Sequence, residues 1–109
     1  MFLTTQDHFS EYKITETLGL VKGNTVRARH VGKDILATFR NVVGGEIEEY
    51  TKLLAESREQ SIDRMIAMAK TMGADGIVCV RFTTSSVMQA AAEMFVFGTA
   101  VKLKKKEKT

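Results

Sequence analysis

The longest regular pattern of apolar positions in the chain lies between Ile47 and Met72. Positions at alternating steps of three and four recur there, which is the spacing of one face of an α-helix. This face consists of Ile47, Tyr50, Leu54, Ser57, Ser61, Met65, Met68 and Met72, and Ile62, Ile66 and Ala69 widen it. Gly73 can adopt the left-handed conformation in which many helices end. The pattern predicts one long helix, from Gly45 to Met72. Its expected core side chains are Tyr50, Leu54, Met65, Met68 and Met72.

Three other stretches have the β-branched and aromatic composition of strands, namely residues 12–29, 77–84 and 94–101. In the first stretch, Gly19 predicts a bulge. The segment Lys22-Gly23-Asn24 predicts a turn or a bulge, because glycine and asparagine tolerate positive φ.

The second stretch is expected to alternate between its two faces. One face would carry Val78, Val80 and Phe82, and the other Ile77, Cys79, Arg81 and Thr83. Residues 84–89 form a polar break, which predicts a loop before the last strand. A shorter apolar stripe predicts a further helix over residues 34–43.

The last strand, residues 94–101, is apolar on both faces. A single helix layer covers only one face of a sheet, so the second face needs another cover. The chain also contains no proline, a residue that protects strand edges against pairing. These features predict a homo-oligomer, in which a neighbouring subunit covers the second face.

The composition indicates one soluble domain and no membrane segment. The chain has 109 residues and lacks an apolar run of the roughly 20 residues that a membrane-spanning helix needs. The start lacks the pattern of a secretory signal, and the single cysteine fits a reducing compartment, so we expect a cytoplasmic protein. We expect the domain to span residues 1–103 and a basic, disordered tail to span residues 104–109.

The positive charge is concentrated at the C-terminal end. The formal net charge is +3, yet residues 102–109 contain five lysines and one glutamate, which leaves the rest of the chain close to neutral. No aromatic residue interleaves these lysines, so the stacking platform of single-strand binders is missing. Nucleic acid is therefore not an expected partner, and any contact with it would be limited to this lysine-rich tail.

Candidate metal ligands are sparse. Heavy metals prefer thiolate and imidazole ligands in closely spaced pairs. The chain offers Cys79 and the separated histidines His8 and His30, with no C-x-x-C or H-x-x-x-H pattern. Cys79 and His30 are the candidates, and a site would require several subunits to contribute to it. A buried or half-buried strand thiol is the alternative interpretation of Cys79.

The densest polar cluster in the sequence is Arg40-Asn41 followed by Gly44-Gly45. Together with Arg58 it could bind an anion or a nucleotide at a subunit junction, although it matches neither a P-loop nor G-x-G-x-x-G. The alternative is structural, with a tight corner at the glycines and arginines that bridge helices or subunits. No catalytic motif is present, so the sequence favours a binding or scaffold protein over an enzyme.

Several blocks of the sequence resemble the YbjQ-like family. They are Leu18-Gly19-Leu20-Val21-Lys22-Gly23, the segment Asp34 to Gly45 with its Arg-Asn-Val-Val-Gly-Gly motif, Ser57-Arg58-Glu59-Gln60, Gly73-Ala74-Asp75-Gly76 and Gly98-Thr99-Ala100-Val101-Lys102. The resemblance covers nearly the whole chain beyond Thr4.

The resemblance implies an α+β subunit of β-α-β-β type in two layers, with a small antiparallel sheet against one long helix, similar in arrangement to dodecin. It also implies assembly into a ring, typically a homopentamer, and a family label of heavy-metal binding. The sequence as a whole therefore predicts a pentameric binding or scaffold protein with a heavy-metal ion as its ligand. The alternatives are a ring that binds a small anion or nucleotide, and an enzyme of unknown type.

Overall fold

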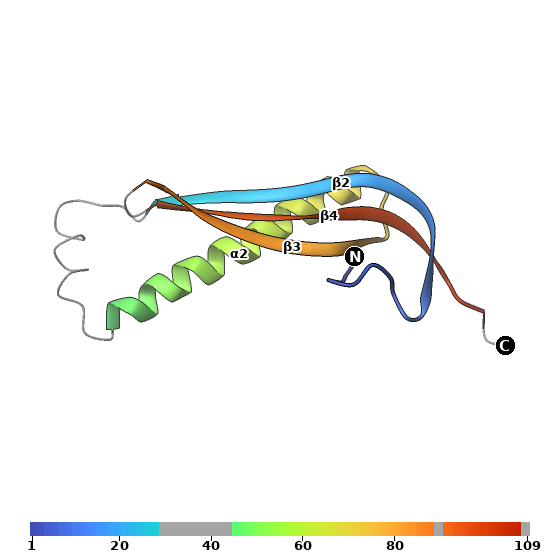
Figure 1. Ribbon diagram of the computed structural model, residues 1–109, viewed down its shortest axis with the longest axis horizontal. Helices are drawn as coiled ribbons and strands as arrows, with labels where there is room; N and C mark the ends of the chain where they lie inside the picture. The colour runs from blue at the N-terminus through green and yellow to red at the C-terminus, as the bar shows by residue number, and fades with distance from the viewer. Residues whose placement is uncertain (29–44, 89–90, 108–109) are drawn as a thin grey trace.

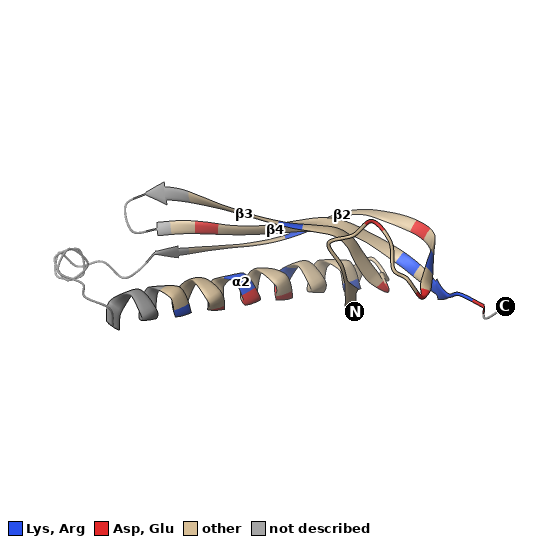
Figure 2. Cartoon of the chain, turned by 60° about the horizontal axis from the view of Figure 1, so that its bottom comes forward, with Lys and Arg blue, Asp and Glu red and all other residues tan. Residues whose placement is uncertain are grey.

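The computed structural model describes residues 1–28, 45–88 and 91–107 (Figure 1). Within these residues the elements are β1 (Phe2–Leu3), β2 (Tyr12–Ala28), α2 (Gly45–Thr71), β3 (Gly76–Met88) and β4 (Ala91–Lys105). The expected helix over residues 34–43 lies outside the described residues. The strands form one sheet in the order β1-β3-β4-β2, and α2 lies along one side of it (Figure 2). The predicted two-layer α+β fold is confirmed.

The sheet is mixed rather than purely antiparallel. β4 is a central strand and pairs antiparallel with both β2 and β3. β1 adds two residues parallel to β3. Beyond β1 the N-terminal segment continues along the same edge, where the Val80 amide donates to the Thr4 carbonyl oxygen over 3.0 Å. This segment therefore covers one end of the β3 edge.

Helix α2 has the predicted extent, and its end follows from the chemistry of Gly73. This glycine has a φ of 77°, a conformation that favours a residue without a Cβ atom. Its amide donates to the Lys70 carbonyl oxygen over 3.1 Å, and the Ala74 amide donates to that of Ala69 over 3.1 Å. These bonds satisfy carbonyl groups that the last turn would otherwise leave free.

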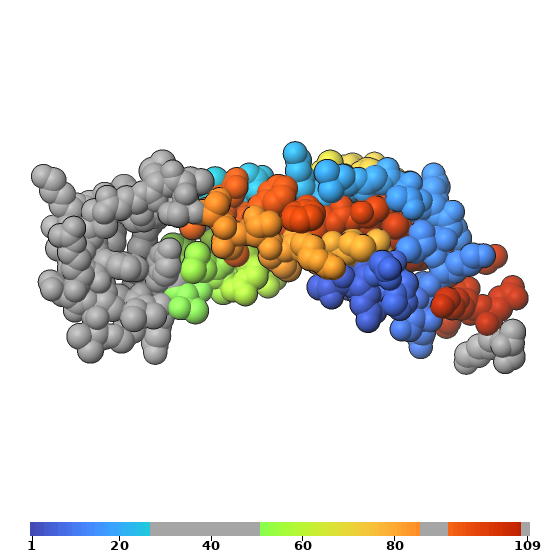
Figure 3. All heavy atoms as spheres, in the orientation of Figure 1, coloured from blue at the N-terminus to red at the C-terminus, as the bar shows by residue number. Residues whose placement is uncertain are grey.

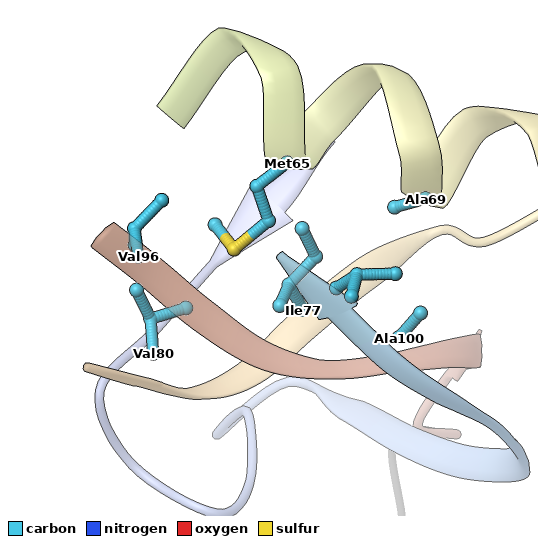
Figure 4. Close-up of a cluster of buried hydrophobic side chains, with 7 residues drawn as sticks. Met65, Ala69, Ile77, Val80, Val96 and Ala100 are labelled. Carbon is cyan, nitrogen blue, oxygen red and sulfur yellow. The ribbon is translucent and has the colours of Figure 1, made fainter. Parts of the chain in front are cut away.

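The core lies where the C-terminal half of α2 crosses the sheet (Figure 4). Its buried cluster consists of Val21, Met65, Ala69, Ile77, Val80, Val96 and Ala100. The helix contributes buried residues at every fourth position, which are Ser57, Ser61, Met65 and Ala69. Met68 lies one position off this row and is 39% exposed, so its expected place in the core is wrong. Met72 and Ile66 pack against the cluster from its margin.

Gly23 is a contact point with the helix and not a turn. β2 runs from Tyr12 to Ala28 and its register is regular at residues 22–24, which contradicts the turn or bulge expected there. A Cβ atom at Gly23 would overlap the Ser61 carbonyl oxygen and lie 2.6 Å from the Met65 amide nitrogen. The absence of a side chain at Gly23 therefore allows the α2 backbone to rest directly on β2.

Buried hydroxyl groups join α2 to the sheet beside this contact. The Thr25 hydroxyl donates to the Ser57 carbonyl oxygen over 3.1 Å, and its oxygen lies 3.0 Å from the Ser61 hydroxyl. The Ser61 hydroxyl also lies 3.1 Å from the Met94 carbonyl oxygen. Helix, β2 and β4 thus share one buried polar network, whose members satisfy one another.

The register shifts at two places between β2 and β4 and at two places between β3 and β4, and one shift of each pair lies at a residue with positive φ. The bulge predicted at Gly19 is confirmed by a register shift between Thr17 and Gly19 and a φ of 135°. A second bulge lies between Val78 and Arg81, where Cys79 has a φ of 56°. The expected alternation of residues 77–83 is therefore wrong. Ile77 and Val80, predicted on opposite faces, both lie in the core cluster because the bulge shifts the pattern by one residue.

Strands β3 and β4 are longer than the sequence indicated. β3 continues to Met88, so the loop predicted over residues 84–89 is wrong for most of its length. The polar residues there pair with β4, as Ser85 does with Glu93. β4 continues to Lys105, two residues beyond the expected domain boundary. The Lys106 amide then donates to the Glu11 carbonyl oxygen over 2.9 Å.

Candidate functional site: the open face of the sheet

No described helix or strand lies over the middle of the sheet face opposite α2, whereas Val78, at one end of this face opposite Thr99, is buried. In Figure 3 the atoms of β2, β4 and β3 face the viewer side by side. The strand register assigns residues to this face, because Val21, Val96 and Ala100 on the other face are buried against the helix. The open face comprises Leu20, Lys22, Asn24 and Val26 of β2, Glu93, Phe95, Phe97 and Thr99 of β4, and Arg81, Thr83 and Ser85 of β3.

Large apolar side chains lie on the open face on two adjacent strands, Leu20 and Val26 on β2 and Phe95 and Phe97 on β4. Leu20 is 63% exposed and Val26 is 55% exposed. Phe95 and Phe97 are half-buried and lie with their ring centroids 5.5 Å apart. Exposed large apolar side chains that share one surface mark an interaction site more often than scattered ones do.

Two cations flank the aromatic pair. Lys22 of β2 and Arg81 of β3 lie on either side of Phe97, because both pair with it in register. Both residues are exposed. The Arg81 guanidinium also donates to the Thr5 carbonyl oxygen over 2.6 Å and to that of Val80 over 2.9 Å, which fixes it at the edge of the sheet. The centre of the open face is therefore both apolar and positively charged.

Helix α2 carries both acidic and basic residues along its length (Figure 2). A shallow hollow of about 460 Å³ lies there, lined by Lys52, Ala55, Glu56, Glu59, Gln60 and Asp63. Three carboxylates against one ammonium group make this hollow acidic. The charge of this hollow is therefore opposite to that of Lys22 and Arg81 on the open face.

Cys79, the thiol candidate for a metal site, lies in the β3 bulge. It is free and half-buried, and its amide donates to the Gln6 carbonyl oxygen over 2.8 Å. Within the described residues, no three side chains of the types His, Cys, Asp and Glu come together to hold a metal ion. The described part of one chain therefore does not fit a heavy-metal centre. The second candidate, His30, lies outside the described residues.

The other histidine of the chain, His8, is hydrogen-bonded to Asp7. Its Nδ1 atom lies 2.8 Å from Oδ1 of Asp7, and both side chains are largely exposed. The hydrogen bond from His8, and then its charge, hold the pKa of the Asp7 carboxyl below its ordinary value.

Most residues of the anion site predicted from the sequence lie outside the described residues. Arg40, Asn41 and Gly44 lie outside the described residues, and Gly45 is the first residue of α2. Arg58 is exposed on the helix. The anion site stays a prediction.

The motif residue Asp75 has a structural role. Its Oδ2 atom accepts a hydrogen bond of 2.9 Å from the Leu103 amide, and its own amide donates to the Val101 carbonyl oxygen over 2.9 Å. Asp75 thus fastens the exit of α2 to β4. Within the described residues, no helix combines the length and the apolar character that a membrane crossing requires.

The sequence predicted a second apolar face on the last strand, but the turn or bulge expected at residues 22–24 concealed the contribution of β2 to it. With β2 continuous, the alternation of buried Val21, Gly23 and Thr25 leaves Leu20, Lys22 and Val26 on the other side. The signal that could have revealed this face is the strand-like alternation of residues 20–26, which continues through Gly23 without a break.

Within the described residues, four strands and one helix in two layers, with an open face on the sheet, define a small α+β protein. Comparison with known proteins gives the family. A family model described as "Putative heavy-metal-binding", the YbjQ family, matches residues 1–104, and the chain belongs to this family. A UPF0145 protein from Dehalococcoides mccartyi is 58% identical over 101 residues, which cover 93% of this chain and 97% of the relative.

Relatives from archaea are nearly as similar. A UPF0145 protein from Methanococcus vannielii is 52% identical over 96% of this chain and 100% of its own length. One from Archaeoglobus fulgidus is 54% identical over 95% of this chain and 96% of its own length. A crystal structure of a protein of unknown function, from the DUF74 family of Pediococcus pentosaceus, has a TM-score of 0.64 at 17% identity. It covers 95% of this chain and 98% of its own, and it supports the fold.

Proposed function

We propose that this protein acts as a homo-oligomeric binding scaffold, in the ring of five subunits that the family resemblance implies. The observation that carries the proposal is the open face of the sheet. Leu20 and Val26 are more than half exposed there, beside the Phe95–Phe97 pair. Covering this face with a second copy would remove apolar surface from water at roughly 25 cal/mol per Å².

The charges favour one mode of association. The open face presents Lys22 and Arg81, and the outer side of α2 presents Glu56, Glu59 and Asp63. Docking the open face of one copy on the acidic hollow of the next helix pairs unlike charges around an apolar centre. Such a head-to-tail contact uses two different surfaces of each subunit, and it closes into a ring when the rotation per subunit permits.

Native mass spectrometry of a tag-free protein tests this proposal. The expected result is a pentamer for the wild type at micromolar concentration. The double variant Leu20→Lys/Val26→Lys should be monomeric, because it introduces two charges into the contact. Phe82→Lys is the matched control. Phe82 is 44% exposed but pairs with Val96, which places it on the helix side of the sheet.

The control variant should keep the assembly, and all three proteins should show the same far-ultraviolet circular dichroism. A wild-type monomer, or an assembly that survives the double substitution, would contradict the proposed interface.

Metal binding is proposed at the level of the assembly. The family description names heavy metals, while the described residues of one chain do not supply a ligand set. Cys79 is the free thiol of the chain, and a symmetric ring brings several copies of each residue around one axis. We propose that any heavy-metal ion is held by Cys79 thiolates of different subunits.

The test is metal analysis of the untagged assembly after incubation with zinc or cadmium ions, for the wild type and for Cys79→Ser. The wild type should retain metal at less than one ion per subunit, and Cys79→Ser should retain none while staying oligomeric. Equal metal content in both proteins would exclude the thiol as a ligand, without affecting the proposed ring.

A further inference from the structure

We propose that the end of the β2–β4 ribbon farthest from the N-terminus of α2 binds an oligophosphate, meaning a short run of linked phosphate groups. The site consists of Lys13, Lys104, Lys105 and Lys106, which we call the lysine cluster. Its ligand chemistry is that of tripolyphosphate, whether free or as the phosphate chain of a nucleotide. This inference is independent of the proposed assembly, because all four lysines belong to one chain.

The lysine cluster is built on ordered backbone. Lys13 of β2 and Lys104 of β4 are cross-strand partners, and Tyr12 pairs with Lys105. The Lys106 amide continues the pairing with its 2.9 Å bond to the Glu11 carbonyl oxygen. Directly opposed side chains of like charge repel each other, so the Lys13–Lys104 pair weakens the ribbon unless an anion lies between the two ammonium groups.

The described carboxylates do not neutralise this cluster. The described residues contain one ion pair within 4.0 Å, between His8 and Asp7. The lysines line a hollow of about 400 Å³ together with Glu107. Four lysines and one glutamate line the hollow, so its lining residues carry an excess of positive charge.

The shape and the lining select the ligand. A hollow of this volume suits a compact anion better than an extended polymer. Lysine ammonium groups act as point charges that bind phosphate without requiring a fixed orientation. No aromatic side chain lines the hollow, so it offers no stacking surface for a nucleobase. The phosphate groups themselves are therefore the recognised part.

Isothermal titration calorimetry with tripolyphosphate at low ionic strength tests the site. The wild type should bind it, and Lys13→Ala/Lys104→Ala should weaken binding by about tenfold or more. The matched control is Lys52→Ala/Lys70→Ala, which removes the same charge from α2. That control should change binding by about twofold at most.

Two further arms identify what is recognised. ATP should compete with tripolyphosphate, and adenosine should not. Lys13→Arg/Lys104→Arg should retain binding, because the charges are kept. Circular dichroism should show all variants folded.

The proposal is overturned if tripolyphosphate does not bind at low salt, or if both alanine pairs lose affinity equally. It is also overturned if adenosine competes, or if a long single-stranded DNA binds while tripolyphosphate does not.

Discussion

Gly23 of β2 and Ser61 of α2 approach so closely that a Cβ atom on the glycine would overlap the serine carbonyl oxygen. Helices usually meet sheets through layers of interdigitating side chains. Here the backbone of the helix rests on the backbone of the strand at one point. The contact sets the position of α2 over the sheet, and the buried residues Met65 and Ala69 follow from it along the same row.

The Gly23 contact predicts a large cost for a single methyl group. Gly23→Ala should lower the free energy of unfolding by about 3 kcal/mol, because the helix must move as a body to admit the Cβ atom. Gly73→Ala is the comparison, since a Cβ atom there meets nothing closer than 3.9 Å but the φ of 77° is unfavourable. Its cost should be about 1–2 kcal/mol. Urea denaturation measures both, and similar values would contradict the contact.

The buried hydroxyls of Thr25 and Ser61 should be energetically coupled. They lie 3.0 Å apart and are almost completely buried. Thr25→Val or Ser61→Ala alone leaves polar partners unsatisfied and should cost about 1–3 kcal/mol. The double variant should cost less than the sum of the two by about 1 kcal/mol in a double-mutant cycle. Additive effects would show that the two hydroxyls act separately.

Exchanging charges across the proposed contact should separate a head-to-tail ring from other assemblies. Lys22→Glu or Glu59→Lys alone places like charges together and should weaken the assembly in analytical ultracentrifugation. The combination of both should recover part of the loss, because the exchanged pair attracts again. Failure of the combined variant to recover would point to a different partner surface for Lys22.

Asp75 should stabilise the fold mainly through its hydrogen-bond acceptor oxygen and less through its negative charge. Asp75→Ala removes the bond to the Leu103 amide and should cost about 1 kcal/mol. Asp75→Asn keeps a carbonyl oxygen in place and should cost less. Thermal unfolding of both variants gives the comparison, with the larger fall in Tm expected for alanine. Equal losses would mean that the negative charge is what stabilises the corner.

The acid side of the stability curve should carry a small contribution from Asp7. Its pKa is lowered in the folded chain by the hydrogen bond from His8. The contribution is therefore present above the pKa of the unfolded chain and is lost as the pH falls through the lower, folded value. Titration followed by NMR should give a pKa for Asp7 below its ordinary value. In His8→Ala the pKa should return upward, and an unchanged value would contradict the assigned cause.

The extent of α2 could be predicted because its signals are local. The steps of three and four, and the glycine at position 73, depend only on the helix itself. Gly19 was likewise readable as a bulge from its place inside a strand. The row of buried helix residues was harder to predict, because Met68 and Ala69 are both apolar and both fit the helical spacing of the buried face. Only the angle at which α2 crosses the sheet places Ala69 inside and Met68 outside.

The last strand predicted that an uncovered apolar face exists, but the residues that β2 and β3 contribute to it could not be predicted, because their placement depends on partners distant in sequence. Gly23 has the composition of a turn, and only the approach of Ser61 explains it. Cys79 breaks the alternation of β3 through a bulge, and the neighbouring N-terminal segment bonds to its amide. Polar residues of β3 such as Ser85 resemble a loop until β4 is placed beside them.

The central position of β4 has a consequence for the order of folding. Among the described strands, β2 pairs only with β4, and β3 meets β2 only through it. The bonds between β2 and β4 join residues far apart in the sequence, such as Thr25 and Met94. Contacts that close such long loops form slowly. We therefore expect the pairing of β2 with β4 to be a late step in folding, and the open face to be complete only after it.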